Sequence, residues 1–328
     1  MNWTLHSIET FSTYQPQWDQ LNQQSGNTPL LSSLFVKPLI QYFANNRDQL
    51  AICGDIDQPT AMAIITKRKL GVWETLQPSQ APIGLWLQQP KADLNALLSS
   101  LIKTLPFPSL LFGITQQDPD LFPRPEPQKK INTLDYIQTA RVTLQGSFED
   151  YWSQRGKNLR QNLRRQRNRM TREEITPQLK ILTEPQHIEQ AIIDYGNLES
   201  AGWKNAEGTA IHINNAQGQF YRDMLTNFCK QKNGLVFQYF YNDQLVATDL
   251  CIKNDDALII LKTTYDEKIT TSSPAMLMRQ DAFEVIFERQ LTKKIEFYGK
   301  VMNWHTKWSD EIRRLYHINF YRIPFRKK

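Results

Sequence analysis

Cysteine is scarce in this chain, and its placement argues against disulfides and metal sites. The 328 residues include three cysteines, Cys53, Cys229 and Cys251, which are odd in number and widely scattered. Neither they nor the five histidines show the spacing of metal ligands. Buried thiols in an apolar core are the expected role. This usage predicts a reducing compartment, which we interpret as the cytoplasm, and no metal.

Long apolar runs and several well-known catalytic motifs are also missing. No run approaches the roughly 20 residues that cross a bilayer. The first residues lack the basic start and apolar stretch of a secretory signal. The sequence contains no Walker loop, no dinucleotide-binding glycine fingerprint and no G-x-S-x-G elbow. We therefore expect no transmembrane segment, and none of the reactions that those motifs support.

The composition is that of a globular protein, with 40% hydrophobic and 22% charged residues. A chain of this length favours two domains. The proline-rich stretch 118–127 cannot hold a helix or a central strand, so it predicts a long loop that closes the first half. We expect domains at residues 1–140 and 141–328.

The second half has a clear order of apolar patterns. Turn-forming Asn and Asp residues at 242–243 and 254–256 separate three apolar runs, which predicts an antiparallel meander. Apolar residues at helical spacing lie before and after this meander, and Pro274 is placed to begin the helix that follows it. The expected order is strand 179–182, two helices ending with 217–231, strands 235–241, 245–252 and 257–265, helix 274–289, and strands 294–298 and 315–323.

The first half repeats this order in outline, without obvious residue identity. Its expected elements are a helix near 34–43, strands at 49–53, 60–66 and 72–76, a helix at 94–102 and a strand at 110–114. The sequence therefore predicts an α/β (α+β) protein with two similar halves, each a mixed, mostly antiparallel sheet flanked by helices.

Several short blocks resemble the GNAT superfamily. They are Tyr265-Asp266, Ser273-Pro274, the segment 296–299, Lys307-Trp308, Gly202-Trp203-Lys204 and the basic run 157–165. Together they resemble the cellulose-biosynthesis-type acetyltransferase family, and more distantly the Fem-type peptidoglycan aminoacyltransferases. The resemblance covers residues 140–325 well and the first half loosely. It implies two GNAT-like halves, with an acyl-CoA donor bound by the second.

The loop before the helix at Pro274 is the expected donor site. Hydroxyl side chains precede a helix N-terminus there, where backbone N–H groups and the helix dipole favour a pyrophosphate. The sequence departs from the glycine-rich GNAT pattern, with Ala275 where glycine is often found. An ordinary capping segment is the alternative. The residues expected at the donor are Thr271, Ser272, Ser273, Ala275 and Met276.

A basic helix expected at 151–170 also needs a role. Its apolar stripe predicts core packing, while Lys157, Arg160, Arg164 and Arg167 share an adjacent face. A solvated face is one interpretation. The other interpretation is that this helix binds CoA phosphates, an anionic acceptor, anionic lipid or nucleic acid. We assign Arg160 and Arg164 to the donor site. Nucleic acid is the weakest of these because no recognised nucleic-acid motif accompanies the run.

Direct acyl transfer needs a base and a proton donor. Tyr265 and Asp266 end a strand beside the donor loop, so we expect Tyr265 to protonate the leaving thiolate and Asp266 to act as base or acceptor anchor; a packed tyrosine and a turn aspartate are the structural alternative. Asp249 lies inside an apolar strand with Ala247 and Cys251. It is a general base with a raised pKa if that face lines a cleft, and has no role if the face is solvent-exposed.

By resemblance, the expected acceptor residues are Trp203, Lys204, Lys307 and Trp308. The predicted function is an acyltransferase moving an acyl group from acyl-CoA to an amine or hydroxyl on a small-molecule or saccharide acceptor. The resemblance implies a role in envelope or exopolysaccharide metabolism. Two alternatives remain: a Fem-type transferase using charged tRNA, and a non-catalytic module that kept the fold without donor binding.

Overall fold

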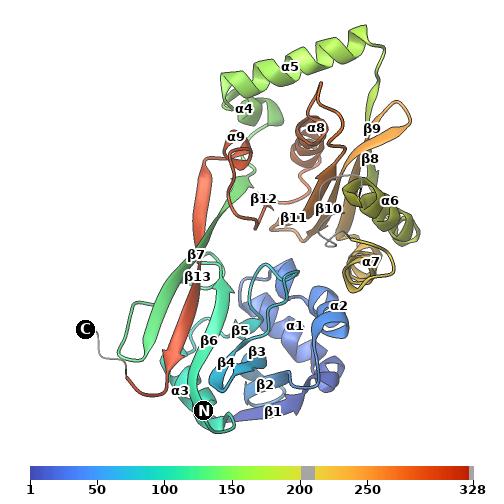
Figure 1. Cartoon of the computed structure of the whole chain (residues 1–328). Coiled ribbons are helices and arrows are strands. Elements are labelled where there is room, and N and C mark those ends of the chain that lie inside the picture. Colours follow the sequence, from blue (N-terminus) through green and yellow to red (C-terminus); the bar gives the residue numbers. More distant parts are fainter. Residues whose placement is uncertain (201–210, 325–328) are drawn as a thin grey trace. The chain divides into compact units, whose positions relative to one another are not determined.

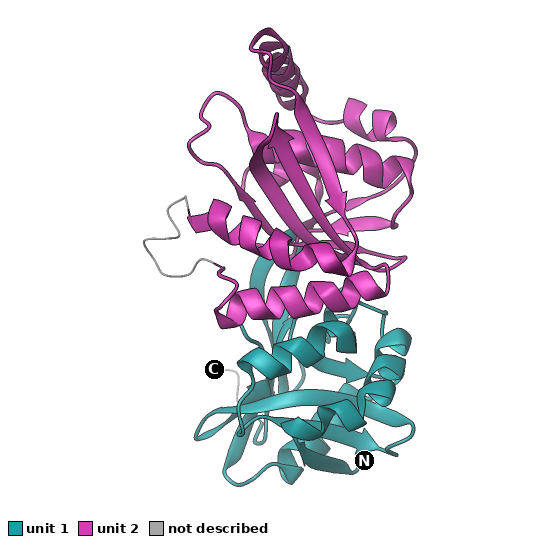
Figure 2. Ribbon diagram, turned by 90° about the vertical axis from the view of Figure 1, so that its right-hand side faces the viewer, with its two compact units in different colours: residues 1–139, 313–328 teal, residues 140–312 magenta. Residues whose placement is uncertain are grey.

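The computed structural model describes residues 1–200 and 211–324. It divides into two compact units, which Figure 2 shows in different colours. Unit 1 comprises residues 1–139 and 313–328, and unit 2 comprises residues 140–312. The expected domains 1–140 and 141–328 follow chain order, whereas residues 313–328 return to unit 1. Strands β7 (Ile131–Thr143) and β13 (Glu311–Tyr321) both contain residues of each unit.

Unit 1 is built on a mixed sheet in the order β1-β2-β3-β4-β6-β13. The pairs are antiparallel except for β4 and β6, and β5 also pairs with β3. The strands and helix expected between residues 49 and 114 are confirmed. The elements are β1 (Trp3–Ser7), α1 (Gln15–Gln24), α2 (Ser33–Phe43), β2 (Gln49–Gly54), β3 (Pro59–Lys69), β4 (Gly71–Thr75), β5 (Trp86–Gln88), α3 (Leu94–Thr104) and β6 (Ser109–Gln117).

Unit 2 has the strand order β7-β12-β11-β10-β9-β8. Its pairs are antiparallel except for β11 with β12, which the crossover helix α8 connects in parallel. The elements are α4 (Phe148–Ser153), α5 (Lys157–Arg172), β8 (Pro177–Leu182), α6 (Ile188–Ser200), α7 (Ala216–Lys230), β9 (Gly234–Tyr241), β10 (Gln244–Lys253), β11 (Leu258–Tyr265), α8 (Pro274–Glu288), β12 (Lys294–Glu296) and α9 (His305–Trp308).

Helices cover both faces of the unit 2 sheet. Helix α8 packs on one face and α6 and α7 on the other (Figure 1). The core on the α8 side joins that helix to apolar side chains of β9, β10 and β11. The meander, α7 and α8 lie where the sequence predicts them. The expected fold class, two halves that each have a mixed sheet flanked by helices, is confirmed.

One expected helix is wrong. The segment 151–170 is two helices, α4 and α5, because the chain is extended at Gly156, where φ is −51° and ψ is 135°. Glycine is a poor helix residue and a frequent helix start, which explains the break. Helix α5 therefore has an N-terminus of its own, capped by no side chain.

Candidate functional site

The ladder between β11 and β12 is short. Leu258 pairs with Ile295 and Ile259 with Glu296, and within the described residues β12 ends there. From Ile260 to Tyr265, β11 pairs with β10 alone. The two parallel strands thus separate toward the end of β11 that leads to α8. This is the edge at which a GNAT-like fold would offer backbone groups to a ligand.

The first turn of α8 presents several amides. Its N-cap residue Ser273 makes no side-chain capping bond, and Pro274 has no N–H to satisfy. No described residue accepts a hydrogen bond from the N–H groups of Thr271, Ser272 or Ala275. Unpaired amides at a helix N-terminus attract anions because the helix dipole adds positive potential.

One amide of this turn is already occupied. The N–H of Ser273 donates to Oε1 of Gln166 on α5, at 2.8 Å. Gln166 is buried and its Nε2 donates to Oδ1 of Asn162 at 3.2 Å, which fixes the orientation of its amide. Ser272 Oγ lies 2.8 Å from the hydroxyl of Tyr241. The turn is therefore partly filled by protein groups.

A cavity of about 560 Å³ opens beside this turn. Four segments line it: the link between α4 and α5, the first half of α5, the N-terminus of α8, and α9 together with Asp310. Ser273 and Met276 come from α8, Lys307 from α9, and Asn158 and Asn162 from α5. The volume lies within the range of small-molecule sites. A cation, amide side chains and a helix N-terminus therefore surround one space.

Arg155 forms part of the wall of this cavity and of a second one of about 360 Å³. Its side chain is 10% exposed, pairs with Asp310 at 3.2 Å, and donates to the carbonyl of Trp308 at 3.1 Å. Its guanidinium also lies over the ring of Tyr151, 4.9 Å from the centroid. Burial raises the pKa of the Tyr151 hydroxyl, which donates to the same Trp308 carbonyl at 2.6 Å.

The predicted donor residues divide into two groups. Ser273 and Met276 line the 560 Å³ cavity together with Lys307. Thr271 is exposed, Ser272 bonds to Tyr241, and Ala275 packs against the apolar core. The structure thus gathers three predicted residues from α8 and α9 around one space.

The cations of α5 do not act as one face. Nη2 of Arg167 pairs with Asp281 of α8, which also accepts from the hydroxyl of Tyr239 at 2.7 Å. Nε of Arg160 donates to the carbonyl of Arg155 at 3.0 Å. Lys157 and Arg164 are exposed. Two of the four cations therefore make contacts that hold α5 in place.

The predicted catalytic residues lie elsewhere in unit 2. Tyr265 is 44% exposed, and Asp266 accepts from Nε2 of Gln244 at 3.2 Å and from the Lys268 N–H in its own turn. Neither residue lines the two cavities described above. They stand at the exposed end of β11, next to the loop that leads to α8.

Asp249 belongs to a buried polar cluster. Nη2 of Arg279 lies 3.2 Å from Asp249 Oδ2 and 3.1 Å from Thr263 Oγ1, and both charged side chains are 2% exposed. The guanidinium stacks over Trp304, 4.6 Å from the ring centroid. Burial raises the pKa of Asp249, although Arg279 opposes the shift. The face of β10 that carries Asp249 is thus neither open cleft nor solvent.

The acceptor residues predicted by resemblance have different surroundings. Trp308 is fully buried, and its indole N–H donates to the sulfur of Met276 at 3.4 Å. Lys307 is exposed at the cavity. Trp203 and Lys204 lie outside the described residues.

Sequence reasoning missed Arg155, Asn158, Asn162, Gln166 and Asp310. A signal for two of these was present: Asn158 and Asn162 are spaced i, i+4 on α5, each one position before a buried leucine of its apolar stripe. Gln166 occupies a buried position in that stripe, between Leu163 and Met170. A polar side chain on a buried helical stripe points to a specific hydrogen bond.

His305 gives a testable pH dependence. Burial lowers its pKa to about 4, with the Arg279 charge adding to the shift, while the Met302 N–H donates to its Nδ1 at 3.0 Å. The unfolded state, with a pKa near 6.5, takes up the proton first, so stability falls as pH drops from about 6.5 to about 4. We expect a slope of up to ~1.4 kcal/mol per pH unit in urea unfolding.

In His305→Gln this contribution disappears, so the pH profile of the variant should be flatter by about one proton. Burial also lowers the pKa of His317. Its contribution to the pH dependence is the same in the parent protein and in the variant, so it cancels in the comparison. Identical profiles would mean that water reaches His305.

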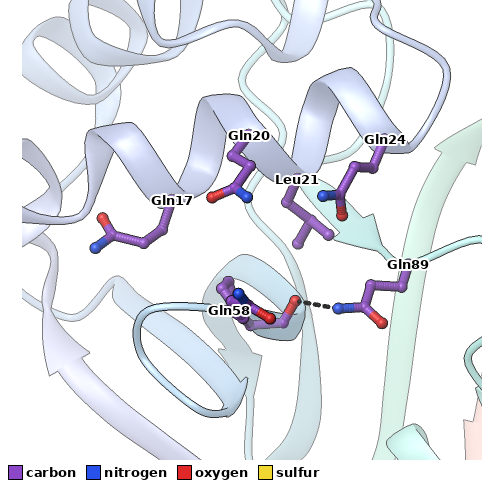
Figure 3. A pocket seen from close by; sticks show the side chains of 7 residues that line it. Gln17, Gln20, Leu21, Gln24, Gln58 and Gln89 are labelled. Carbon is purple, nitrogen blue, oxygen red and sulfur yellow. Dashed lines mark hydrogen bonds between the residues drawn. The ribbon is translucent and has the colours of Figure 1, made fainter.

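Unit 1 offers a smaller cavity of about 140 Å³ (Figure 3). Gln17, Gln20 and Gln24 of α1 face Gln58 and Gln89 across it, and Gln89 donates to the carbonyl of Pro59 at 3.1 Å. Its lining residues include no ionisable side chain, so it offers no acid or base. Within residues 1–200 and 211–324, no three His, Cys, Asp or Glu side chains gather as metal ligands would. The described helices include none that is long and apolar enough to span a membrane.

Comparisons with known proteins agree with the geometry of unit 2. Residues 157–306 match the sequence model of a family described as "Acetyltransferase (GNAT) domain". No curated protein matches the chain. The match begins at α5 and ends within α9, so it includes Ser273 and Met276. Over these residues the chain is therefore similar to a GNAT domain.

Solved structures share the fold over nearly the whole chain. FemX has 8% identity and a TM-score of 0.61, covering 98% of this chain and 97% of its own. The C-terminal domain of a candidate lysylphosphatidylglycerol synthetase from Agrobacterium fabrum has 10% identity and a TM-score of 0.58, covering 94% and 91%. A tandem GNAT protein from the clavulanic acid biosynthesis pathway has 8% identity and a TM-score of 0.51, covering 99% and 100%. At these identities the likeness establishes a tandem GNAT-like fold.

Proposed function

We propose that unit 2 is an acyltransferase of the cellulose-biosynthesis-type GNAT family, which binds an acyl-CoA donor at the N-terminus of α8. The observation that best supports this proposal is the 560 Å³ cavity, which both this N-terminus and Lys307 line. A diphosphate is an anion, and the positive end of a helix dipole and a lysine are groups that bind anions. The match of residues 157–306 to a GNAT domain supports this choice of donor.

In this proposal the acceptor is a small-molecule or saccharide amine or hydroxyl, which attacks the thioester carbon directly. The C–N or C–O bond forms, the C–S bond breaks, and the acceptor loses one proton while the thiolate gains one. We propose that Asp266 takes the proton from the acceptor and that Tyr265 donates a proton to the thiolate. Their place at the separating end of β11 supports this assignment.

Calorimetric titration with acetyl-CoA and longer acyl-CoAs tests the proposal. Lys307→Ala is expected to weaken binding by about tenfold (~1.4 kcal/mol), because a charge-assisted contact is lost. Lys300→Ala is the matched control, since Lys300 is an exposed lysine nearby in sequence that does not line the cavity. Equal losses in both variants would contradict the site.

A second function has support of its own. Lys157, Arg164, Arg165 and Arg172 are exposed on α5 with no described acidic partner, a surface suited to a polyanion such as charged tRNA. If acyl-CoA fails to bind at millimolar concentration and charged tRNA binds with strong salt dependence, the Fem-type reaction replaces acyl-CoA transfer. If neither donor binds, unit 2 is a binding module.

A further inference from the structure

Unit 1 carries a cluster of exposed apolar side chains. Leu70, Phe107, Leu110 and Ile323 are 76%, 82%, 50% and 72% exposed. Leu70 forms the turn between β3 and β4, Phe107 lies in the loop between α3 and β6, Leu110 is the second residue of β6, and Ile323 follows β13. We call these four side chains the apolar patch. Scattered exposed apolar residues are ordinary, whereas a gathered set marks an interaction surface.

The segments that carry the patch are neighbours. Gly71 pairs with Ser109, and a Cβ at Gly71 would lie 3.4 Å from Cδ1 of Leu110, so Leu110 covers the turn that holds Leu70. The Arg322 N–H donates to the Leu110 carbonyl at 2.9 Å, which brings Ile323 to the same edge.

The loop of Phe107 reaches the same place. The guanidinium of Arg322 donates to the carbonyls of Ile102, at 3.1 Å, and Ser109, at 3.4 Å. These two carbonyls bracket the loop that holds Phe107. Three separate segments therefore bring the apolar patch together at one end of unit 1.

Cations surround the apolar patch. Lys67 and Lys69 precede Leu70, Lys103 lies near the end of α3, and the Tyr321 N–H donates to the carbonyl of Lys130 at 2.9 Å, which places the pair Lys129-Lys130 beside the end of β13. Within residues 67–75, 103–110, 129–131 and 320–323, Glu74 is the acidic residue, and it pairs with Arg68 at 3.2 Å. The rim of the patch thus has an excess of positive charge.

We propose that this end of unit 1 docks on a membrane surface that contains anionic phospholipid. The apolar patch would enter the boundary between headgroups and acyl chains, and the lysines would contact the phosphates. The positive rim favours an anionic membrane over a second copy of the chain, because two such rims would repel each other. The proposal is independent of the donor site in unit 2.

Cosedimentation of the full chain with vesicles tests this docking. Binding is expected to vesicles of phosphatidylcholine plus phosphatidylglycerol, to weaken with salt, and to be much weaker with phosphatidylcholine alone. The double variant Leu70→Ser and Phe107→Ser should lose about tenfold in vesicle affinity, and Lys69→Glu with Lys103→Glu should lose the preference for anionic lipid.

Controls of the same chemistry lie away from the apolar patch. Ile56 is 42% exposed and precedes β3, whereas Leu70 follows it, so Ile56→Ser changes an exposed apolar residue at the opposite end of that strand. Lys91→Glu is the matched charge control. Both should bind vesicles like the parent chain, and thermal unfolding of all variants verifies folding.

Three results would overturn the proposal. They are an absence of binding by the parent chain, equal binding to neutral and anionic vesicles, and unchanged binding by the double serine variant. Self-association in sedimentation velocity that Phe107→Ser abolishes, without vesicle binding, would assign the apolar patch to a second copy instead.

Discussion

Replacing Gln166 by glutamate is expected to weaken acyl-CoA binding by about 100-fold (~2.7 kcal/mol). Gln166 Oε1 accepts the Ser273 N–H at 2.8 Å, so a carboxylate in its place would sit at the α8 N-terminus, where we propose the diphosphate binds. Two like charges about 4 Å apart repel by several kcal/mol at an effective dielectric constant of about 20. Calorimetric titration with acetyl-CoA measures the loss.

The fold should tolerate this change. A carboxylate near a helix N-terminus stabilises it by about 0.3–1 kcal/mol, and Asn162 can rotate its amide to donate to the second oxygen. Gln161→Glu is the matched control, because it makes the same charge change at an exposed position of α5, five residues before Gln166. If Gln166→Glu binds acetyl-CoA as tightly as Gln161→Glu, the donor does not use this turn.

Arg279→Met should destabilise the protein by about 3–5 kcal/mol. The substitution keeps most of the side-chain volume but leaves Asp249, whose side chain is 2% exposed, without its charged partner. An unpaired buried carboxylate is costly, and the stacking on Trp304 is lost as well. Urea unfolding at neutral pH measures the change.

Two comparisons separate the ion pair from simple packing. The double variant Arg279→Met with Asp249→Leu should recover at least half of the loss, because it removes the orphaned charge. The loss in Arg279→Met should also be smaller at low pH. Without Arg279 the folded-state pKa of Asp249 rises further, so the folded protein binds a proton more readily than the unfolded one as pH falls. A loss below about 1 kcal/mol would show that water solvates Asp249.

Much of the site could be placed from the sequence because its signals are local. Hydroxyl residues followed by Pro274 predict a helix start, and Lys307 follows from a short block of residues. The walls could not be predicted, since Arg155, Asn158 and Asp310 face the cavity through packing of α5, α8 and α9. The hydrogen bond from the Ser273 N–H to Gln166 joins residues that lie 107 positions apart in the sequence.

The sequence by itself determined the order of the elements from β8 to β12 and the start of α8. Both features depend on the periodicity of apolar residues, on turn-forming residues and on one proline, all of which act between near neighbours in the sequence. The tertiary structure alone decided that α5 begins after a break at Gly156, that residues 313–328 join unit 1, and that Asp249 meets Arg279. Such outcomes depend on which distant surfaces pack together and on which buried charges need partners, and a local pattern does not encode either.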